Sequence, residues 1–402
     1  MKPYSFIEPV TKLFELLNKL HHEILKDICS VIIKIYIMET MQKSKIDYRK
    51  LVHELGTSFS SRAKENDEAG RFVYENYKDL KEYKLFSALV PEELGGLDMP
   101  YSEMCLFIKN IAKYCASTAL AFSMHQHLVA ASVWKYKHKG IGEQMLRNVA
   151  ENQLVLVSTG AKDWLGSNGT MKRVDGGYLL NAKKHFASQS VVGDVAVTSA
   201  PYLNDNNEWK VLHFPVKFES KGVSTFDDWN VLGMRATGSH TLLFEDVFVP
   251  EESIALERDQ DEFHPVWNVV LTVAMPLIMS VYVGIAEKAM HLAISKAKAS
   301  NTDQEHVKYC LGKLYNTYVG AEKQWRAMFE IANDLDFDIA VDNSVDILSL
   351  KSNVSDACIA TVSEVMDLVG GQSFYKSYEL ERLFRDVQAS KFHPLPKWNQ
   401  YA

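Results

Sequence analysis

The stretch from Leu156 to Ser190 reads LVSTGAKDWLGSNGTMKRVDGGYLLNAKKHFASQS, and it decides the fold. Before it, hydrophobic residues recur with a helical period. Inside it they begin to alternate with polar residues, which is the period of a β-strand. The sequence Asp175-Gly176-Gly177 is a strong signal for the tight turn of a β-hairpin. The change of period therefore predicts a β domain that begins near residue 153.

Short alternating runs continue to about residue 252 and are bounded by Gly, Asn, Asp and Pro. They read LVLVS, YLLNA, DVAVTSA, KVLHFPV and HTLLFEDVFV. Because no helical segment separates these runs, they predict an antiparallel barrel or sandwich and not a parallel sheet with crossover helices. No G-x-G-x-x-G follows any of them, so the sequence gives no support for a dinucleotide-binding unit.

The segments on either side of the β domain have helical periodicity, which predicts an α+β multidomain protein. We expect a helical domain at residues 46–152, a β domain at 153–252 and a four-helix bundle at 253–402. The segment Ser117–Tyr136 should be a core helix because its apolar residues share one face. In the third part, Pro276 should break or kink a long apolar helix, and Gly370-Gly371 should end a later one.

Residues 1–45 are expected to be an extension of the fold. The apolar run Ile28–Met38 is too short to span a bilayer and is a poor signal peptide, so no membrane span is predicted. One interpretation is an additional amphipathic helix. The other, slightly favoured, is that translation starts at Met38 or Met41.

Composition excludes several classes of function. The net charge of −7 gives no basic excess, so nucleic-acid binding has little support. Five scattered cysteines form neither a CxxC pair nor a Cys/His cluster, which argues against a disulfide framework and a metal site. Free buried thiols are typical of a protein of the reducing cytoplasm.

The order of elements, together with five motifs, resembles the acyl-CoA dehydrogenase superfamily from about residue 50 to residue 393. Each motif is weak alone, but five in the right order and context are strong. They read LVPEELGGLDMPYSEM, LVSTGAKDWLGSNG, NAKKHFASQS, LGMRATGSHTLLFEDVFVP and VGGQSFYKSYELERLFRDVQA.

The resemblance implies a flavin between the β domain and the bundle, in a homotetramer or homodimer, with FAD expected and FMN as the alternative. Hydroxyls near the start and end of the opening stretch, an aromatic residue and turn glycines also suit a flat, polar-edged heterocycle. The implied cofactor-binding residues are Ser158, Thr159, Phe186, Ser188, Gly370 and Gly371. Taken singly, each has a structural alternative as a strand cap, core residue or helix terminator.

The resemblance also implies a carboxylate base, and the sequence lacks it at both family positions. One position is Pro394, counted from Asp386, and the other is Ala274, counted from Gly284. His393 lies beside the first position and is the candidate catalytic residue in its place, since imidazole can accept a proton near neutral pH. On the substrate side we expect Trp164, Ser167 and Arg235, although Arg235 could instead be structural.

The ending Arg385-Asp386…His393-Pro394 resembles that of a subset of the superfamily, whose members include monooxygenases that form a C4a adduct of reduced flavin with oxygen. Histidines stabilise that adduct, which makes His125 and His127 candidates beside His393; the alternative for each is a satisfied core residue. The family's phosphate-binding Arg-x-x-Phe-Gly is replaced by KAKASNTDQEHVKY at residues 296–309, which makes FMN more credible.

The sequence thus predicts a flavin-dependent oxidoreductase that acts on an acyl-CoA thioester or a similar CH–CH substrate. The alternative is a reduced-flavin monooxygenase, and a non-catalytic homologue is a third interpretation. Expected partners are a small-molecule substrate, further copies of the chain, and an electron-transfer flavoprotein or a flavin reductase.

Overall fold

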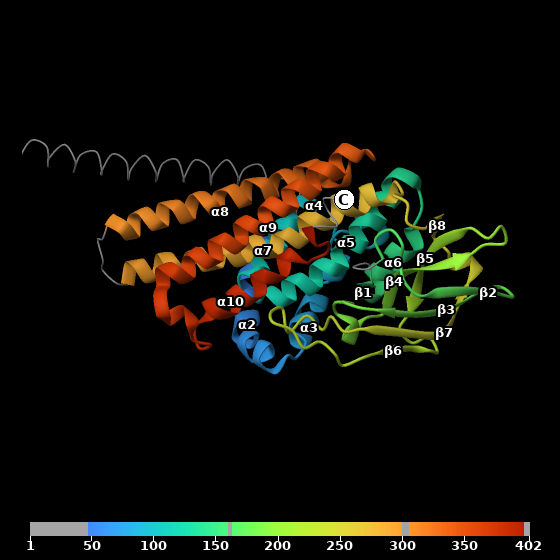
Figure 1. Ribbon diagram of the computed structural model, residues 1–402, viewed down its shortest axis with the longest axis horizontal. Coiled ribbons are helices and arrows are strands. Elements are labelled where there is room, and N and C mark those ends of the chain that lie inside the picture. The colour runs from blue at the N-terminus through green and yellow to red at the C-terminus, as the bar shows by residue number, and fades with distance from the viewer. Residues whose placement is uncertain (1–46, 160–162, 300–304, 398–402) are drawn as a thin grey trace, which may run out of the picture. The chain divides into compact units, whose positions relative to one another are not determined.

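The computed structural model describes residues 47–159, 163–299 and 305–397. The predicted extension at residues 1–45, with both interpretations of it, lies outside the described residues. Helices of the first part occupy the expected region (Figure 1). They are α2 (Tyr48–Ala69), α3 (Tyr74–Glu82), α4 (Tyr101–Ala112), α5 (Ala116–Lys139) and α6 (Glu143–Asn152).

Helix α5 is a core helix, as its spacing predicted. Nearly every side chain from Ala116 to Ala130 is buried, so the helix is covered on all sides and not on one face only. A helix that is hydrophobic all round must lie inside a larger protein. Its carboxyl end is closed by Gly140, whose φ of 68° is the left-handed conformation that terminates helices.

The β region forms two four-stranded sheets that pack as a sandwich and not as a closed barrel. One sheet has the order β1 (Leu156–Ser158), β4 (Val195–Leu203), β5 (Trp209–Lys217), β8 (Leu256–Asp259). The other has the order β2 (Thr170–Val174), β3 (Gly177–Lys184), β7 (Leu242–Pro250), β6 (Val223–Thr225). Residues from both sheets, among them Val157, Leu180, Phe214 and Phe244, form their own hydrophobic core.

The hairpin predicted at Asp175-Gly176-Gly177 is present between β2 and β3. Val174 pairs with Gly177, and Gly176 has a φ of 73°. Two details differ from the prediction. β1 runs parallel to β4, whereas all other pairs among the described strands are antiparallel, and β8 pairs with β5 beyond residue 252, so the strands extend to Asp259.

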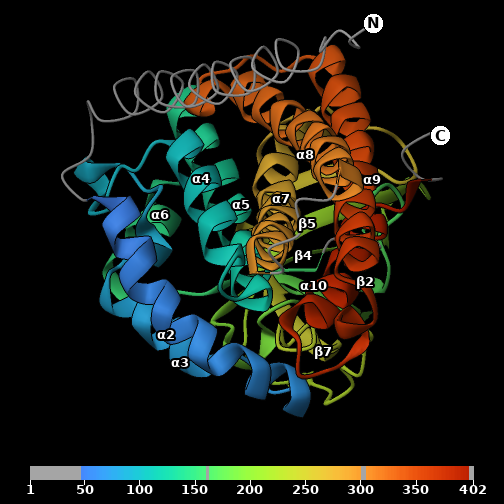
Figure 2. The same cartoon turned by 90° about the vertical axis from the view of Figure 1, so that its left-hand side faces the viewer.

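The last part of the chain forms long helices that lie side by side (Figures 1 and 2). They are α7 (Val266–Ala299), α8 (Glu305–Ala332), α9 (Val341–Val369) and the shorter α10 (Glu379–Val387). The predicted seam of α8 is buried at Leu314, Tyr318, Ala321, Trp325, Met328 and Ala332. Helix α9 ends at Gly370 as expected.

Helix α7 continues through Pro276, so a break, one of the two effects expected there, does not occur. The helix continues for 34 residues because the segment is buried between its neighbours, and packing decides its conformation. The carbonyl oxygen of Pro276 accepts hydrogen bonds from Ser280 Oγ at 2.7 Å and from Trp325 Nε1 at 3.1 Å.

Helix α7 connects the two helical parts of the protein. It contacts α4 and α5 on one side and α8, α9 and α10 on the other (Figure 2). Among the described residues it is long and apolar enough to cross a membrane, but 94% of its most apolar window is buried, as in a core helix. The two helical parts therefore share one hydrophobic core, while the sandwich has another.

Close contact between α4 and α7 requires a glycine. A Cβ on Gly284 would lie 2.2 Å from the carbonyl oxygen of Lys109, which no side chain tolerates. Next to this contact, Glu287 of α7 pairs with Lys109 at 2.6 Å and with Lys113 at 3.0 Å. Although burial by itself raises the pKa of Glu287, the two ammonium groups lower it to about 2.

This buried cluster gives the first testable prediction. Replacing Glu287 by Gln leaves Lys109 with one carboxylate, Glu322 at 3.4 Å, and should destabilise the protein by about 3 kcal/mol at pH 7. Because the carboxyl pKa is lowered in the folded state, the difference is full above pH ~4.5 and should vanish as the pH falls toward 2. Chemical denaturation at several pH values measures it.

The matched control is Lys313→Gln, which removes the ion pair with Glu364 on the surface of α8. The Lys313 side chain is 61% exposed, so this change should cost less than about 1 kcal/mol. Equal losses for the two variants would contradict the assignment of Glu287 to the packing of α4 on α7.

Candidate functional site

Phe186 lies two residues after the end of β3 and is 53% exposed. Its φ of 62° is uncommon for an aromatic residue, and such outliers concentrate at functional sites. The ring meets Trp229 edge to face, with 6.0 Å between the ring centroids. The fold therefore holds a large aromatic side chain in an exposed place, where it can pack against a flat ligand.

A chain of hydroxyl groups begins at Ser188. Its Oγ lies 2.8 Å from Ser239 Oγ, which lies 2.7 Å from Thr237 Oγ1, and Thr237 donates to the carbonyl of Met234 at 3.0 Å. Because each hydroxyl has one proton, Ser239 donates to Thr237 and Ser188 donates to Ser239. The lone pairs of Ser188 are then left to accept a hydrogen bond from a ligand.

His127 and His393 form a second polar group, on α5 and in the segment after α10. The Nδ1 atom of each is buried and has no hydrogen-bond partner among the described residues. Burial lowers the pKa of His393 to about 3, with further contributions from the nearby Lys351 and His127. Burial lowers the pKa of His127 to about 4. Both imidazoles are therefore neutral at physiological pH.

His125 has both ring nitrogens occupied. One lies 2.7 Å from the carbonyl oxygen of Phe86, and the other accepts the backbone N–H of Leu156 at 3.0 Å. This geometry fits the alternative of a satisfied core histidine that joins β1 to α5. His125 therefore has no ring nitrogen left to act on a ligand.

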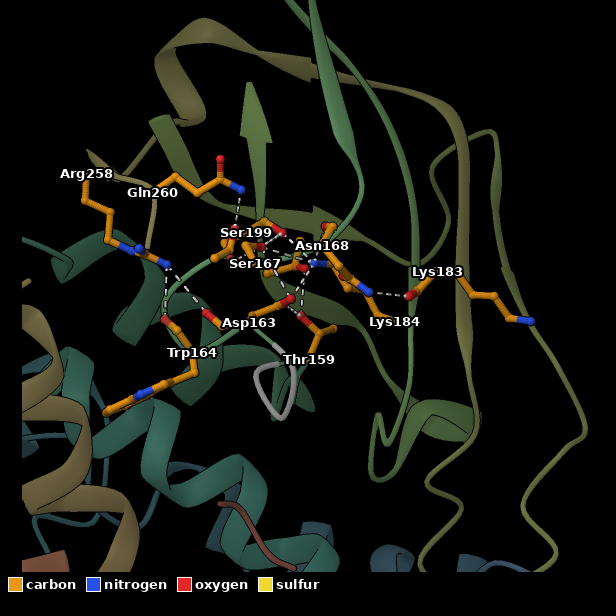
Figure 3. Close-up of polar contacts among 12 residues, drawn as sticks. Thr159, Asp163, Trp164, Ser167, Asn168, Lys183, Lys184, Ser199, Arg258 and Gln260 are labelled. Atoms are coloured by element: carbon orange, nitrogen blue, oxygen red, sulfur yellow. Dashed lines mark hydrogen bonds and ion pairs between the residues drawn. The ribbon is translucent and has the colours of Figure 1, made fainter. Parts of the chain in front are cut away.

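Two hydroxyl residues of the opening stretch, Thr159 and Ser167, belong to a buried network. Thr159 is 2% exposed, and its hydroxyl lies 2.7 Å from Thr198 Oγ1 and 3.2 Å from Asp163 Oδ2. Ser167 also contacts Asp163, at 3.3 Å, and belongs to the same buried network (Figure 3). Ser158 is half-buried at the end of β1. The side chains of Thr159 and Ser167 thus organise this segment and do not line an open edge.

Trp164 packs on Trp267 of α7, with 4.8 Å between the ring centroids, and so connects the sandwich to the bundle. The Nε1 atom of Trp267 is buried without a partner among the described residues. A hydrogen-bond acceptor of a ligand would satisfy it.

Arg235 lies in a different place from the histidines. It lines a pocket of about 620 Å³ between α2, the loop at residues 231–235 and α10, together with Lys376 and Arg385. None of His127, His393 and Phe186 lines that pocket. Gly370 and Gly371 are exposed after α9, and a Cβ added to either would meet no described atom within 4 Å, so close approach inside this chain does not require them.

Several residues that the sequence did not single out organise the site. Asp386 of α10 is buried and accepts the backbone N–H of Met234 at 2.6 Å, which fixes the loop that carries Thr237 and Ser239. Burial raises the pKa of Asp386 to about 6. The Glu-Arg-x-x-Arg-Asp motif contained it, but only the fold shows what it holds.

At the two expected positions of a carboxylate base, Ala274 is a buried apolar residue of α7 and Pro394 follows His393. Neither can take a proton. In the described part of the chain no group of His, Cys, Asp and Glu residues could hold a metal ion.

Two family models match the chain. The acyl-CoA dehydrogenase N-terminal domain matches residues 45–153, and the acyl-CoA dehydrogenase C-terminal domain matches residues 277–397. Among curated relatives, the amino sugar nitrososynthase DnmZ of Streptomyces peucetius is 23% identical over 84% of this chain and 86% of its own. An acyl-CoA dehydrogenase of Bacillus subtilis is 22% identical over 87% and 94%.

Solved structures share the fold of this chain. A nitrososynthase from Micromonospora carbonacea var. africana has a TM-score of 0.81 at 22% identity, covering 90% of this chain and 96% of its own. KijD3 in complex with FMN and a dTDP-linked amino sugar has a TM-score of 0.79 at 24% identity, covering 90% and 93%. The chain belongs to the acyl-CoA dehydrogenase superfamily of flavin-dependent oxidoreductases.

Proposed function

We propose that this protein is a reduced-flavin-dependent monooxygenase that oxidises a small molecule. The observation that carries the proposal is the replacement of the expected carboxylate by neutral histidines. Ala274 and Pro394 occupy the base positions, whereas Nδ1 of His127 and Nδ1 of His393 are buried and have no partner among the described residues. Relatives named as nitrososynthases and a neighbour that binds FMN support the same choice.

Reduced flavin, when bound, supplies the electrons that activate dioxygen. Phe186, Ser188 and the Ser239–Thr237 chain fit such a ring, because an exposed aromatic surface lies beside an oriented hydroxyl. Ser188 is left as an acceptor, and reduced flavin has a ring N–H where oxidised flavin has none. A hydroxyl that accepts a hydrogen bond therefore binds the reduced flavin better than the oxidised flavin.

The histidines contribute as neutral groups. With a pKa far below 7, each ring keeps one N–H donor and one acceptor at working pH. His393 and His127 can therefore hold a proton near the reacting oxygen without adding positive charge. Burial of their Nδ1 atoms excludes water from the same place.

FMN is the cofactor we propose, because the segment that would carry the family's phosphate-binding Arg lacks it. The exposed glycines Gly370 and Gly371, followed by Phe374 and Tyr375 at 85% and 68% exposure, are proposed to contact a second copy of the chain. A flavin reductase in the cytoplasm would deliver the reduced cofactor.

Acyl-CoA dehydrogenation is the second candidate. The match of both domains to acyl-CoA dehydrogenase models favours it. It requires a base for the α-proton of a thioester, and His393 is the residue proposed for that role.

Flavin binding and reactivity separate the candidates. We expect purified protein to bind reduced FMN and then consume oxygen, because the chain offers an acceptor hydroxyl and neutral histidines. Under anaerobic conditions, acyl-CoA thioesters should not bleach the absorbance of the flavin-loaded protein. Bleaching by a thioester would favour the dehydrogenase, and a protein that binds neither FMN nor FAD would exclude both.

His393→Ala and His127→Ala should each release hydrogen peroxide about tenfold faster from protein mixed with reduced FMN and oxygen. The loss of one buried hydrogen bond, about 1.4 kcal/mol, accounts for that factor. His306→Ala, at an exposed position of α8, is the matched control and should behave as wild type.

The pH dependence follows from the lowered pKa values. Because the neutral form of His393 exists above its pKa of about 3, the wild-type rate should be flat between about pH 6 and pH 8. A transition near pH 6.5 that disappears in His393→Ala would contradict the neutral role.

Ser239→Ala should weaken binding of reduced FMN relative to oxidised FMN, because Ser188 loses the acceptor that orients its proton. A fivefold change in relative affinity, about 1 kcal/mol, corresponds to a midpoint potential lower by about 20 mV. Spectroelectrochemical titration measures the shift. Ser190→Ala removes a buried hydroxyl that donates to the carbonyl of Gly238 and serves as the control; an equal shift in both variants would refute the orienting role.

A further inference from the structure

A buried ion pair lies beneath the segment Asp163–Asn168. Lys184 Nζ and Asp163 Oδ1 are 2.7 Å apart, and the two side chains are 1% and 4% exposed. Lys184 is the last residue of β3, whereas Asp163 lies in the connection between β1 and β2. The pair therefore links this connection to the end of β3 (Figure 3).

All three ammonium protons of Lys184 have an acceptor. Besides Asp163 Oδ1, Nζ donates to the carbonyl oxygens of Asn168 at 2.8 Å and Ser199 at 2.6 Å. The carboxylate of Asp163 also lies within 3.2 Å of the Thr159 hydroxyl and 3.3 Å of the Ser167 hydroxyl. The ammonium group of Lys184 and both carboxylate oxygens of Asp163 therefore have fixed partners, and these contacts define one position for the segment.

The other side of the segment is held in the same way. Arg258 of β8 donates to the carbonyl oxygens of Asp163, Trp164 and Leu165, and Gln260 donates to that of Gly166 at 3.0 Å (Figure 3). The segment lies outside the strands of both sheets, and these side-chain contacts are supplemented by one backbone hydrogen bond, from the N–H of Asp261 to the carbonyl oxygen of Leu165 at 3.4 Å. Its position thus depends on a few buried charged groups.

The segment contacts α7 on one side and, through Lys184, the strand end that leads to Phe186 and Ser188 on the other. Trp164 packs on Trp267 of α7, and Thr159 follows the last residue of β1. Lys184 lies two residues before Phe186 and four before Ser188 on the same strand end. A shift of the segment would therefore move Trp164 against the bundle and disturb the aromatic and hydroxyl groups that follow β3.

A hydrophobic pair of similar volume would stabilise such a place as well as two buried charges, since desolvation offsets their attraction. An apolar pair makes no hydrogen bonds, so it cannot fix the orientation of the carbonyl groups of Asn168 and Ser199 as Lys184 does. The two charges therefore orient the segment and add little to the free energy of unfolding.

We infer that Lys184, together with Asp163, is a positioning pair that holds the segment Asp163–Asn168 in register with Phe186 and Ser188 for flavin binding. This inference rests on the proposed function for its flavin part only. The immobilisation of the segment follows from the contacts themselves and can be measured without a cofactor.

The decisive variant is Asp163→Asn with Lys184→Met, which removes both charges together. Its melting temperature should stay within about 4 °C of wild type, because no unpaired charge is left buried. Chymotrypsin cleavage after Trp164 or Leu165, located by mass spectrometry, should be at least about tenfold faster, and the Kd for FMN should rise about tenfold. Lys183→Met is the matched control, since Lys183 is the exposed neighbour on β3, and it should change neither quantity.

Wild-type cleavage and wild-type FMN affinity in the double variant would overturn the inference. If wild-type protein binds no FMN, the proposed function fails, while the cleavage rate still decides whether the pair holds the segment. Should the double variant not fold, Ser167→Ala removes only a hydroxyl that contacts Asp163 and Ser199. Cleavage of that variant should be about threefold faster than wild type, and an unchanged rate would equally refute the positioning role.

Discussion

The burial of α7 is the constraint on which the rest of the structure depends. This apolar helix cannot face water, so other helices must cover it on every side, and they come from both ends of the sequence. The helical parts before and after the sandwich consequently share one core. The β region is inserted between them and keeps a core of its own, which places its strand ends against α5 and α7.

Burial also determines which titratable groups in the interior are charged. Taking an imidazole out of water disfavours its charged form, so His127 and His393 are neutral, and their unpartnered nitrogens, within the described part of the chain, can bond a ligand. Where charges are buried instead, they are paired: Glu287 with Lys109 and Lys113 near α7, and Asp163 with Lys184 in the sandwich. The two histidines are thus neutral, whereas these buried charges are paired. Neutral histidines are compatible with the proposed control of a proton near reduced flavin, whereas Ala274 and Pro394 supply no carboxylate that could abstract one.

Much of the fold could be predicted because it depends on periodicity. The change of period near residue 153, the hairpin at Gly176 and the end of α9 at Gly370 are local properties, and the structure has them. The break considered at Pro276 does not occur, because the local preference of proline is outweighed by the packing of α7. The pairing of β8 with β5 was missed because a four-residue strand has too little pattern of its own. Similarly, the sequence does not distinguish the hydroxyl groups of Thr159 and Ser188. In the structure the Thr159 side chain points into the sandwich, while Ser188 begins a hydroxyl chain to Thr237.

The sequence by itself determined the order of helical and β regions, the positions of turns and the absence of a carboxylate at Ala274 and Pro394, because these depend only on neighbouring residues or on residue identity. Tertiary structure decided which polar groups are satisfied. His125 bonds Phe86 and Leu156, whereas His127, two residues away on the same helix, keeps a nitrogen that no described residue bonds. The pairing of Asp163 with Lys184, 21 residues apart, was likewise decided by the fold. Hydrogen bonds and pKa values depend on distances between residues remote in sequence, and only the packed chain sets those distances.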